Sequence, residues 1–272
     1  FLLSLHEETL WIADEVASTP ILIPKDHGDL ASLDRAIQKL SQKNRSFIVD
    51  PILDPIHFGF TESIVRYREV RKHHPDVEIM MGVGNFTELT HADTAGINAL
   101  LLGICSELHI RQILCTQHAR TAIREAALGR RIMFSARELG RLPKHLHDGL
   151  MALHERAPFP MGVEEIEELQ RAIRDPSFRI QASSNGIHVY NRDGLLSGQD
   201  PFEFYPHLGV SEDGGHAFYL GVEIARAQIA WQLGKRYTQD QPLKWGCQVQ
   251  EQEDPDVDPH AYKPSGSTLG KK

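Results

Sequence analysis

The sequence lacks the features that mark nucleic-acid-binding and membrane-spanning proteins. Its 272 residues carry 29 Lys and Arg against 37 Asp and Glu, giving a formal net charge of −8. A basic face that could meet phosphates is therefore not expected. No apolar run reaches the length of about 18 residues that a membrane-spanning helix needs. These absences exclude a nucleic-acid partner and a membrane span, and they favour a cytoplasmic protein.

Motifs for metal binding and for common hydrolytic or phosphate chemistry are also missing. The three cysteines, Cys105, Cys115 and Cys247, share no CxxC spacing, and they are expected to be reduced thiols, as in a cytoplasmic protein. The 15 histidines include no HExxH pattern, so no zinc site built by the protein is expected. Neither a GxSxG elbow nor a glycine-rich phosphate loop occurs. The sequence alone therefore assigns no catalytic residue and no metal ligand.

What the sequence does contain, over residues 1–140, is an alternation of short apolar strands and helical segments. Runs of four or five buried-type residues followed by polar loops are typical of parallel strands in βα units. Leu30, Leu33 and Ile37 recur at helical spacing after one such loop, with Asp29 as the predicted N-cap. The pattern predicts a parallel α/β sheet of five strands. The predicted strands are 1–5, 21–23, 47–50, 79–83 and 112–115.

The alternation ends near residue 140, and a different pattern follows. Residues 141–175 are predicted as a helical connection, and residues 176–247 as a small α+β domain. In that domain the segments 178–182 and 187–190 flank the turn sequence SSNG and predict a hairpin. A later helix places Val222, Ala225, Ile229 and Leu233 in one stripe, as the core of the domain or as a docking or oligomer helix. Residues 248–272 are acidic, then rich in Pro, Gly and Ser, and are expected to be disordered.

Polar residues follow the third and fourth predicted strands at the point where each strand ends. Asp50 and Asp54 follow the third strand, whereas Asn85, Thr87 and Glu88 follow the fourth. Functional side chains of parallel α/β folds sit at the carboxyl ends of the strands. This edge of the sheet is therefore the first place to expect a binding site.

The two strand ends, VDPILDPIHFGF and GVGNFTE, resemble the pterin-binding superfamily. The longer segments GVGNFTELTHADTAGINALL, TQHAR and RRIMFSAREL resemble the dihydropteroate-synthase-related proteins of archaea and methylotrophic bacteria, which are associated with tetrahydromethanopterin biosynthesis. HAFYLGVEIARAQIAWQLGKRYTQD resembles a domain of unknown function that is fused to the end of those proteins. The resemblance covers roughly residues 1–247.

The resemblance implies a barrel fold of which this chain would supply only some of the strands. It implies that residues 1–140 are the C-terminal part, about five strands, of an eight-stranded TIM-type βα barrel, followed by the small α+β domain. A closed barrel needs all eight strands. A preceding segment or a partner chain is then expected to supply the missing strands. The alternative is an open sheet with one unpaired edge.

The resemblance also implies a pterin-binding site at the strand ends. A carboxylate would accept two hydrogen bonds from the amino-pyrimidinone edge of the pterin. Both Asp50 and Asp54 suit that role, and the sequence does not choose between them. Asn85 would donate to and accept from the pterin ring, and Asn98 would point inward from the following helix. Phe58 or Phe60 would stack on the ring.

By the same resemblance, the expected activity joins a dihydropterin-methyl diphosphate to an arylamine. The protein would build in no cofactor, although the diphosphate would bring Mg²⁺. Asn85 and Phe86 occupy the positions of the Arg-Lys pair of the synthases, so this strand end supplies no cation for the pyrophosphate. The alternatives are methyl transfer from a methyl-tetrahydropterin to a corrinoid and a non-catalytic pterin-binding scaffold. A homo-oligomer is expected. The remaining candidates for phosphate or second-substrate contacts are Lys25, His27, Thr87, Glu88, His118 and Arg120.

Overall fold

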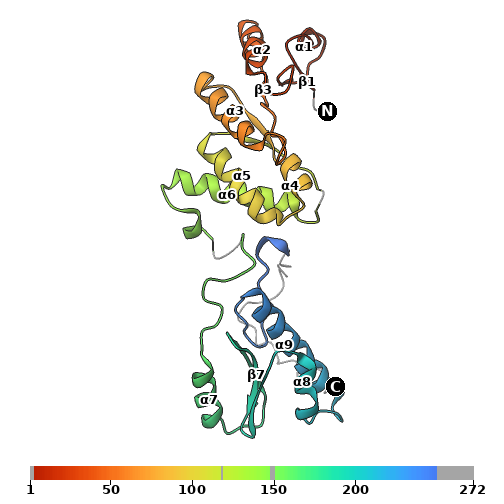
Figure 1. Ribbon diagram of the computed structural model, residues 1–272, viewed down its shortest axis with the longest axis vertical. Coiled ribbons are helices and arrows are strands. Elements are labelled where there is room, and N and C mark those ends of the chain that lie inside the picture. The colour runs from red at the N-terminus through yellow and green to blue at the C-terminus, as the bar shows by residue number, and fades with distance from the viewer. Residues whose placement is uncertain (1–2, 118, 148–150, 250–272) are drawn as a thin grey trace. The chain divides into compact units, whose positions relative to one another are not determined.

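The computed structural model describes residues 3–117, 119–147 and 151–249 and has a mixed α/β fold. It divides the chain into two compact units, Phe1–Met151 and Ala152–Lys272. The division falls inside the predicted connection 141–175, which contains the 3₁₀ turn η1 (Pro143–His145) and helix α7 (Val163–Ala172) (Figure 1). Most of the predicted tail, residues 250–272, lies outside the described residues. Among the helices described, none is long and apolar enough to cross a membrane.

The first unit is built on five parallel strands that pair in chain order. β1 pairs with β2 and β2 with β3, while β4 pairs with β5, all in parallel. A single bridge between Val49 and Ile79 connects the two groups, with the Val49 amide donating to the Glu78 carbonyl at 2.8 Å. Within the described residues the sheet does not close on itself. The strands are β1 Ser4–Leu5, β2 Ile21–Leu22, β3 Ile48–Val49, β4 Met80–Gly82 and β5 Gln112–Leu114.

Helices follow the strands, and the residue before each helix fixes where it begins. Asp29 caps α2 as predicted, accepting a hydrogen bond from the Ser32 amide at 3.1 Å. Gly59 precedes α3 at φ +116°, a value that favours glycine. Asp93 caps α5 and accepts a hydrogen bond from the Ala95 amide at 3.0 Å. The helices of this unit are α1 Ile12–Glu15, α2 Leu30–Gln42, α3 Phe60–His73, α4 Gly84–Thr90, α5 Thr94–Glu107 and α6 Ala122–Glu138.

Helix α4 was not expected, because its residues looked like a polar loop. Phe86 is buried and packs against Phe60, with ring centroids 4.3 Å apart. Thr87 is also buried, and its hydroxyl donates to the carbonyls of Val83 and Gly84. Burial of Phe86 stabilises a short helix where the sequence suggested none, and the back-bonding satisfies the buried hydroxyl of Thr87.

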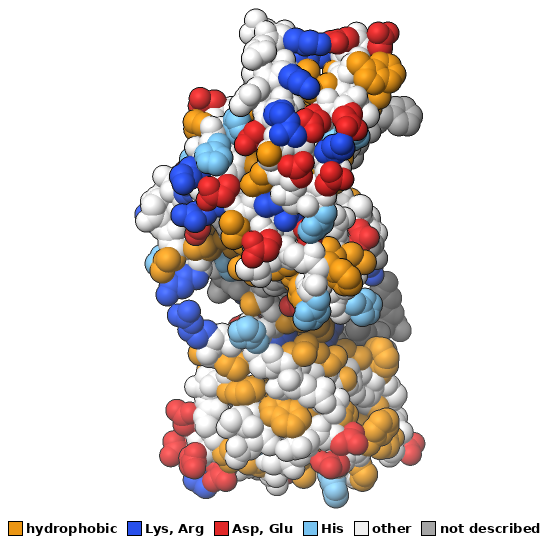
Figure 2. Space-filling model, turned by 45° about the horizontal axis from the view of Figure 1, so that its top comes forward, with side chains coloured by type: hydrophobic (Ala, Val, Ile, Leu, Met, Phe, Trp, Pro, Cys, Tyr) orange, Lys and Arg blue, Asp and Glu red, His pale blue; other side chains and the backbone are white. Residues whose placement is uncertain are grey.

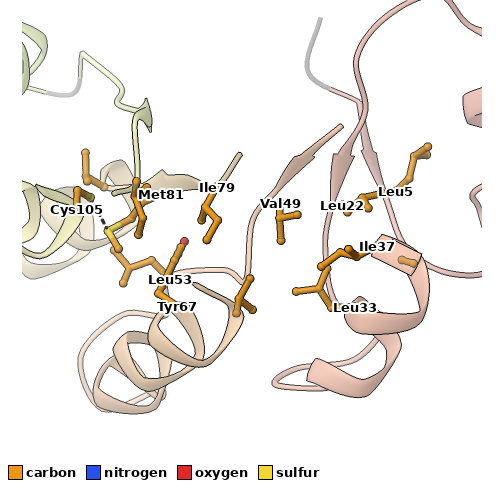
Figure 3. Close-up of a cluster of buried hydrophobic side chains, with 14 of the residues drawn as sticks. Leu5, Leu22, Leu33, Ile37, Val49, Leu53, Tyr67, Ile79, Met81 and Cys105 are labelled. Atoms are coloured by element: carbon orange, nitrogen blue, oxygen red, sulfur yellow. Dashed lines mark hydrogen bonds between the residues drawn. The ribbon is translucent and has the colours of Figure 1, made fainter. Parts of the chain in front are cut away.

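The core of the first unit runs along the sheet and under its helices. Figure 3 shows Leu5, Leu22, Leu33 and Ile37 on one side, and Leu53, Tyr67, Ile79, Met81 and Cys105 on the other. Val49 lies between the two groups and is fully buried. The one bridge between β3 and β4 is therefore reinforced by continuous apolar packing.

The second unit is a three-stranded antiparallel sheet packed against a long helix. The predicted hairpin is confirmed as β6 (Arg179–Ser183) and β7 (Gly186–Asn191), and the sequence missed a third strand, β8 (Gly194–Gly198). Helix α9 (Gly214–Leu233) contacts β6 and β7. The remaining elements are α8 Pro201–Phe204, η2 Tyr205–His207 and η3 Gly246–Gln248.

The face of α9 that forms the core differs from the stripe predicted for it. Leu220, Ile224, Ala227 and Ala230 are buried in the core of this unit. The predicted stripe of Val222, Ala225, Ile229 and Leu233 is partly exposed. The prediction was wrong as a core assignment because α9 is apolar on both faces, so its periodicity does not distinguish them.

Candidate functional site

Polar contacts join the loops at the carboxyl ends of all five strands in the first unit. Each contact connects one loop to the loop after the neighbouring strand, so the side chains form a continuous row along this edge of the sheet. Functional groups of parallel α/β folds gather at this edge. The contacts are Glu8–Lys25 at 2.5 Å, His27–Asp54 at 2.9 Å, Asn85 Nδ2 to the Leu53 carbonyl at 3.4 Å, and Thr116 to Glu88.

The loop between β3 and α3, residues 50–59, is held in an unusual backbone conformation. Ile52 has φ +68° and His57 has φ +70°, and a β-branched residue at positive φ is strained. The buried Arg66 fixes this segment, because its guanidinium donates to the carbonyls of Pro51 at 3.2 Å and Ile52 at 2.8 Å. The loop is therefore positioned by helix α3 rather than by its own propensities.

Asp50 has one carboxylate oxygen engaged and one available. Its Oδ1 accepts hydrogen bonds from the Tyr67 hydroxyl at 2.7 Å and from the Ile52 amide at 2.9 Å. Its Oδ2 accepts none from the part of the chain described. Burial raises the pKa of Asp50, against the opposing effect of the two hydrogen bonds. The side chain is fixed in orientation and keeps a free acceptor for a ligand.

Asp54, by contrast, accepts its hydrogen bonds at one oxygen and is the charged partner of a buried arginine. Its Oδ2 lies 2.5 Å from Arg66 Nη2, 3.0 Å from Ser63 Oγ and 2.9 Å from His27 Nε2. Burial pushes the pKa of Asp54 upward, but the hydrogen bonds from Arg66 and Ser63 outweigh burial and lower it. The two carboxylates that the sequence could not separate thus have different environments: Asp54 belongs to a buried ion pair, whereas Asp50 does not.

Asn98, on α5, is an unsatisfied polar group in the core. Its side chain is 0% exposed, and neither Nδ2 nor Oδ1 has a hydrogen-bond partner in the described structure. Leaving such a group unpaired costs about 1–3 kcal/mol. A buried amide without partners indicates that a ligand or a water satisfies it.

The other predicted site residues are not gathered around one point. Asn85 and Glu88 are exposed, whereas Thr87 is buried and bonded to its own helix. Lys25 and His27 each contact a carboxylate, and Arg120 is exposed. Phe60 packs on Phe86, while the neighbouring Phe58 is 74% exposed. His118 lies outside the described residues.

Sequence analysis missed the residues on α3 that hold the loop. Ser63, Arg66 and Tyr67 are all buried, and each bonds to Asp50 or Asp54. They follow the i, i+3, i+4 spacing of one helix face. Polar residues at the core positions of a helix next to a conspicuous loop were the available indication. Among the described residues, no cluster of three or more His, Cys, Asp or Glu side chains is arranged to hold a metal ion.

Comparison with known proteins gives one relative and no family. No family model matches the chain, and no solved structure matches it. A protein of Methanocaldococcus jannaschii, described as uncharacterized, is 31% identical over 241 residues, which cover 78% of this chain and 46% of the relative. The chain thus spans about half the length of the curated relative that it matches.

Proposed function

We propose that the first unit binds a reduced pterin at the carboxyl ends of β3 and β4. The observation that carries this proposal is Asp50, a half-buried carboxylate with no ion pair among the described residues, which Tyr67 and the Ile52 amide hold by one oxygen while the other stays free. An amino-pyrimidinone edge offers the adjacent donors that such a carboxylate accepts. The unpartnered amide of Asn98 supplies a further donor and acceptor from the following helix. Asp54 is assigned to the support of the loop.

The proposed architecture is the C-terminal part of a TIM-type βα barrel. Five parallel strands that pair in chain order, each followed by a helix, support it, because a barrel of βα units pairs its strands in that order. The exposed residues of β5, Gln112 and Leu114, are consistent with a strand that lacks a neighbour. A closed barrel of this type has eight strands, so the proposal requires further strands from outside residues 1–140.

The proposed reaction is that of a dihydropteroate-synthase-like enzyme of tetrahydromethanopterin or folate-type cofactor biosynthesis. An arylamine would attack the methyl carbon of a dihydropterin-methyl diphosphate and displace pyrophosphate, with Mg²⁺ arriving on the diphosphate. Cations should meet that leaving group. Arg120 is exposed near the end of β5, and it is the member of the predicted set that would contact the phosphates.

A methyltransferase that passes a methyl group from a reduced methyl-pterin to a corrinoid is the second candidate. The observation that favours it is that the nearby basic side chains already have acidic partners. Lys25 lies 2.5 Å from Glu8, and His27 lies 2.9 Å from Asp54. A sheet edge whose basic side chains already contact carboxylates suits a substrate without phosphates better than a diphosphate. A protein that binds pterin without either reaction would be a scaffold subunit.

Calorimetric titration of a reduced pterin into the full-length protein tests the proposal. Asp50→Asn and Asn98→Ala should each weaken binding by about tenfold or more. Asp26→Asn is the matched control, because it makes the same chemical change at an exposed carboxylate after β2. A folded parent that does not bind pterin would reject the proposal.

Two activity assays then separate the candidate reactions. Arylamine-dependent release of pyrophosphate supports the synthase-like reaction, and methyl transfer to an added corrinoid supports the second candidate. Binding that depends on Asp50, with neither activity, supports the scaffold.

A further inference from the structure

His27 and Asp54 form a histidine–carboxylate pair that joins the loops after β2 and β3. His27 Nε2 lies 2.9 Å from Asp54 Oδ2. The Asp54 side chain is 9% exposed, whereas the His27 side chain is 66% exposed. The carboxylate is therefore buried while the imidazole ring is open to solvent and to a ligand. Figure 2 shows histidine side chains at the surface of the first unit, among acidic and basic ones.

The charge of Asp54 decides which nitrogen of His27 carries the proton. Burial raises the pKa of Asp54, but the hydrogen bonds from Arg66 and Ser63 outweigh burial and lower it, so the carboxyl is ionised at neutral pH. An ionised carboxylate can only accept, so neutral His27 must donate from Nε2, which leaves a lone pair on Nδ1. No described residue bonds to Nδ1. A ring held in this way can take a proton from a bound molecule.

The backbone on both sides of this pair is fixed. In the loop that carries His27, the Lys25 amide donates to Ser32 Oγ, on α2, at 2.9 Å. In the loop that carries Asp54, Gly59 leaves room for the pair. A Cβ atom at Gly59 would lie 3.2 Å from Asp54 Oδ2 and 3.5 Å from His27 Cε1. The ring is thus positioned before any ligand arrives, as a catalytic group requires.

His27 lies at the same edge of the sheet as Asp50. Strands β2 and β3 are adjacent and parallel, and the Asp50 amide donates to the Leu22 carbonyl at 2.9 Å. Functional groups of such folds gather at this edge. His74 forms a similar pair with Asp34 at 2.7 Å, but it follows the C-terminal end of α3, before β4 begins, and its side chain is only 17% exposed. The position of His27 therefore distinguishes it from a histidine that only stabilises a surface.

We propose that His27 is the general base of the synthase-like reaction and that Asp54 orients its ring. As the arylamine nitrogen attacks the methyl carbon, a C–N bond forms, and the C–O bond to the diphosphate breaks with its electron pair leaving on pyrophosphate. The nitrogen then carries an extra proton, which His27 Nδ1 accepts and passes to solvent. This role rests on the proposed function, and it places the arylamine beside the loop after β2.

Single-turnover kinetics of the full-length protein, with dihydropterin-methyl diphosphate and 4-aminobenzoate as substrates, test this role. His27→Ala should lower the rate of product formation by about 10²–10⁴-fold, while calorimetry should show the pterin affinity of the parent. Added imidazole should restore part of the lost rate, because the removed ring was open to solvent. His74→Ala is the matched control, since it removes the histidine of a similar pair, and it should keep the rate of the parent.

A second measurement needs no substrate. Nitrogen-15 NMR of the imidazole rings should show neutral His27 protonated at Nε2 and unprotonated at Nδ1. The opposite tautomer would overturn the role, because Nδ1 could not then accept a proton.

The kinetic outcomes separate this role from the proposed function. A folded His27→Ala variant that forms product within about threefold of the rate of the parent, or that imidazole does not rescue, would overturn the role of His27 and leave the synthase-like reaction standing. Loss of pterin affinity in this variant would make His27 a binding residue and would also overturn the role. A parent that binds pterin but forms no product would reject the synthase-like reaction together with its base.

Discussion

Removing the carboxylate of Asp54 should destabilise the first unit strongly. Arg66 is buried and has Asp54 as its charged partner at 2.5 Å, so Asp54→Ala leaves a buried guanidinium without an opposite charge. Breaking a buried pair in this way costs about 3–5 kcal/mol. The hydrogen bonds from Arg66 to Pro51 and Ile52 remain, which places the expected loss near the lower limit, about 3 kcal/mol. With a urea m-value of about 2 kcal/mol/M, the midpoint should fall by roughly 1.5 M.

Urea unfolding followed by circular dichroism measures this loss, and hydrogen exchange assigns it to the first unit. The double variant Asp54→Asn/Arg66→Met should lose less than Asp54→Ala, because it removes both charges. The pKa of Asp54 is lowered in the folded state, so its contribution is present in full above its ordinary value of 3.8 and is lost as the pH falls through the lowered value. A loss below about 1 kcal/mol would be that of a surface salt bridge and would refute the assignment.

Three further predictions test other parts of the site and the core. Asp50→Asn should leave the free energy of unfolding at pH 7 unchanged or higher. Burial raises the pKa of Asp50, so the parent protein loses stability as the pH rises from the ordinary pKa of this carboxyl through the raised value. A clear loss of stability in urea unfolding would contradict this. Ile52→Gly should change stability by less than about 1 kcal/mol, because relief of the backbone strain at positive φ offsets the loss of the side chain. Val49→Gly, in the core, should cost several kcal/mol in the same urea assay. Gly129→Ala places a methyl group 2.9 Å from Leu102 Cδ1 between α5 and α6. Thermal unfolding should show a loss of stability of about 1–2 kcal/mol, which Leu102→Val partly restores. If the stability losses of the two substitutions simply add in the double variant, the prediction is wrong.

The strands and main helices of the first unit were predictable because each strand is a short apolar run bounded by polar residues. Helix α4 was not, since its stability depends on the contact of Phe86 with Phe60, a residue far away in the sequence. β8 was missed for a related reason: GLLSG has too few apolar residues to mark a strand without its pairing to β7.

For the candidate site, the sequence pointed to the loop after β3 but did not distinguish the residues within it. Asp50 and Asp54 look alike in the sequence. Their environments differ because Arg66 and Tyr67, which lie on helix α3, bond to Asp54 and Asp50 respectively. The orphaned amide of Asn98 likewise depends on what packs around α5. Long-range contacts of this kind leave little trace in local periodicity.

The single bridge between β3 and β4 has a consequence for motion. The strands β1–β3 pair with one another through backbone hydrogen bonds, and so do β4 and β5, whereas the described strands β3 and β4 are connected by the single bridge Val49↔Ile79. Asp50 follows β3, on one side of this bridge, and Asn85 follows β4, on the other. A ligand that contacts both residues would restrain the motion of the two groups of strands relative to each other. The rate at which the Val49 amide exchanges with deuterium would then fall on binding, while amides within either group of strands would change less.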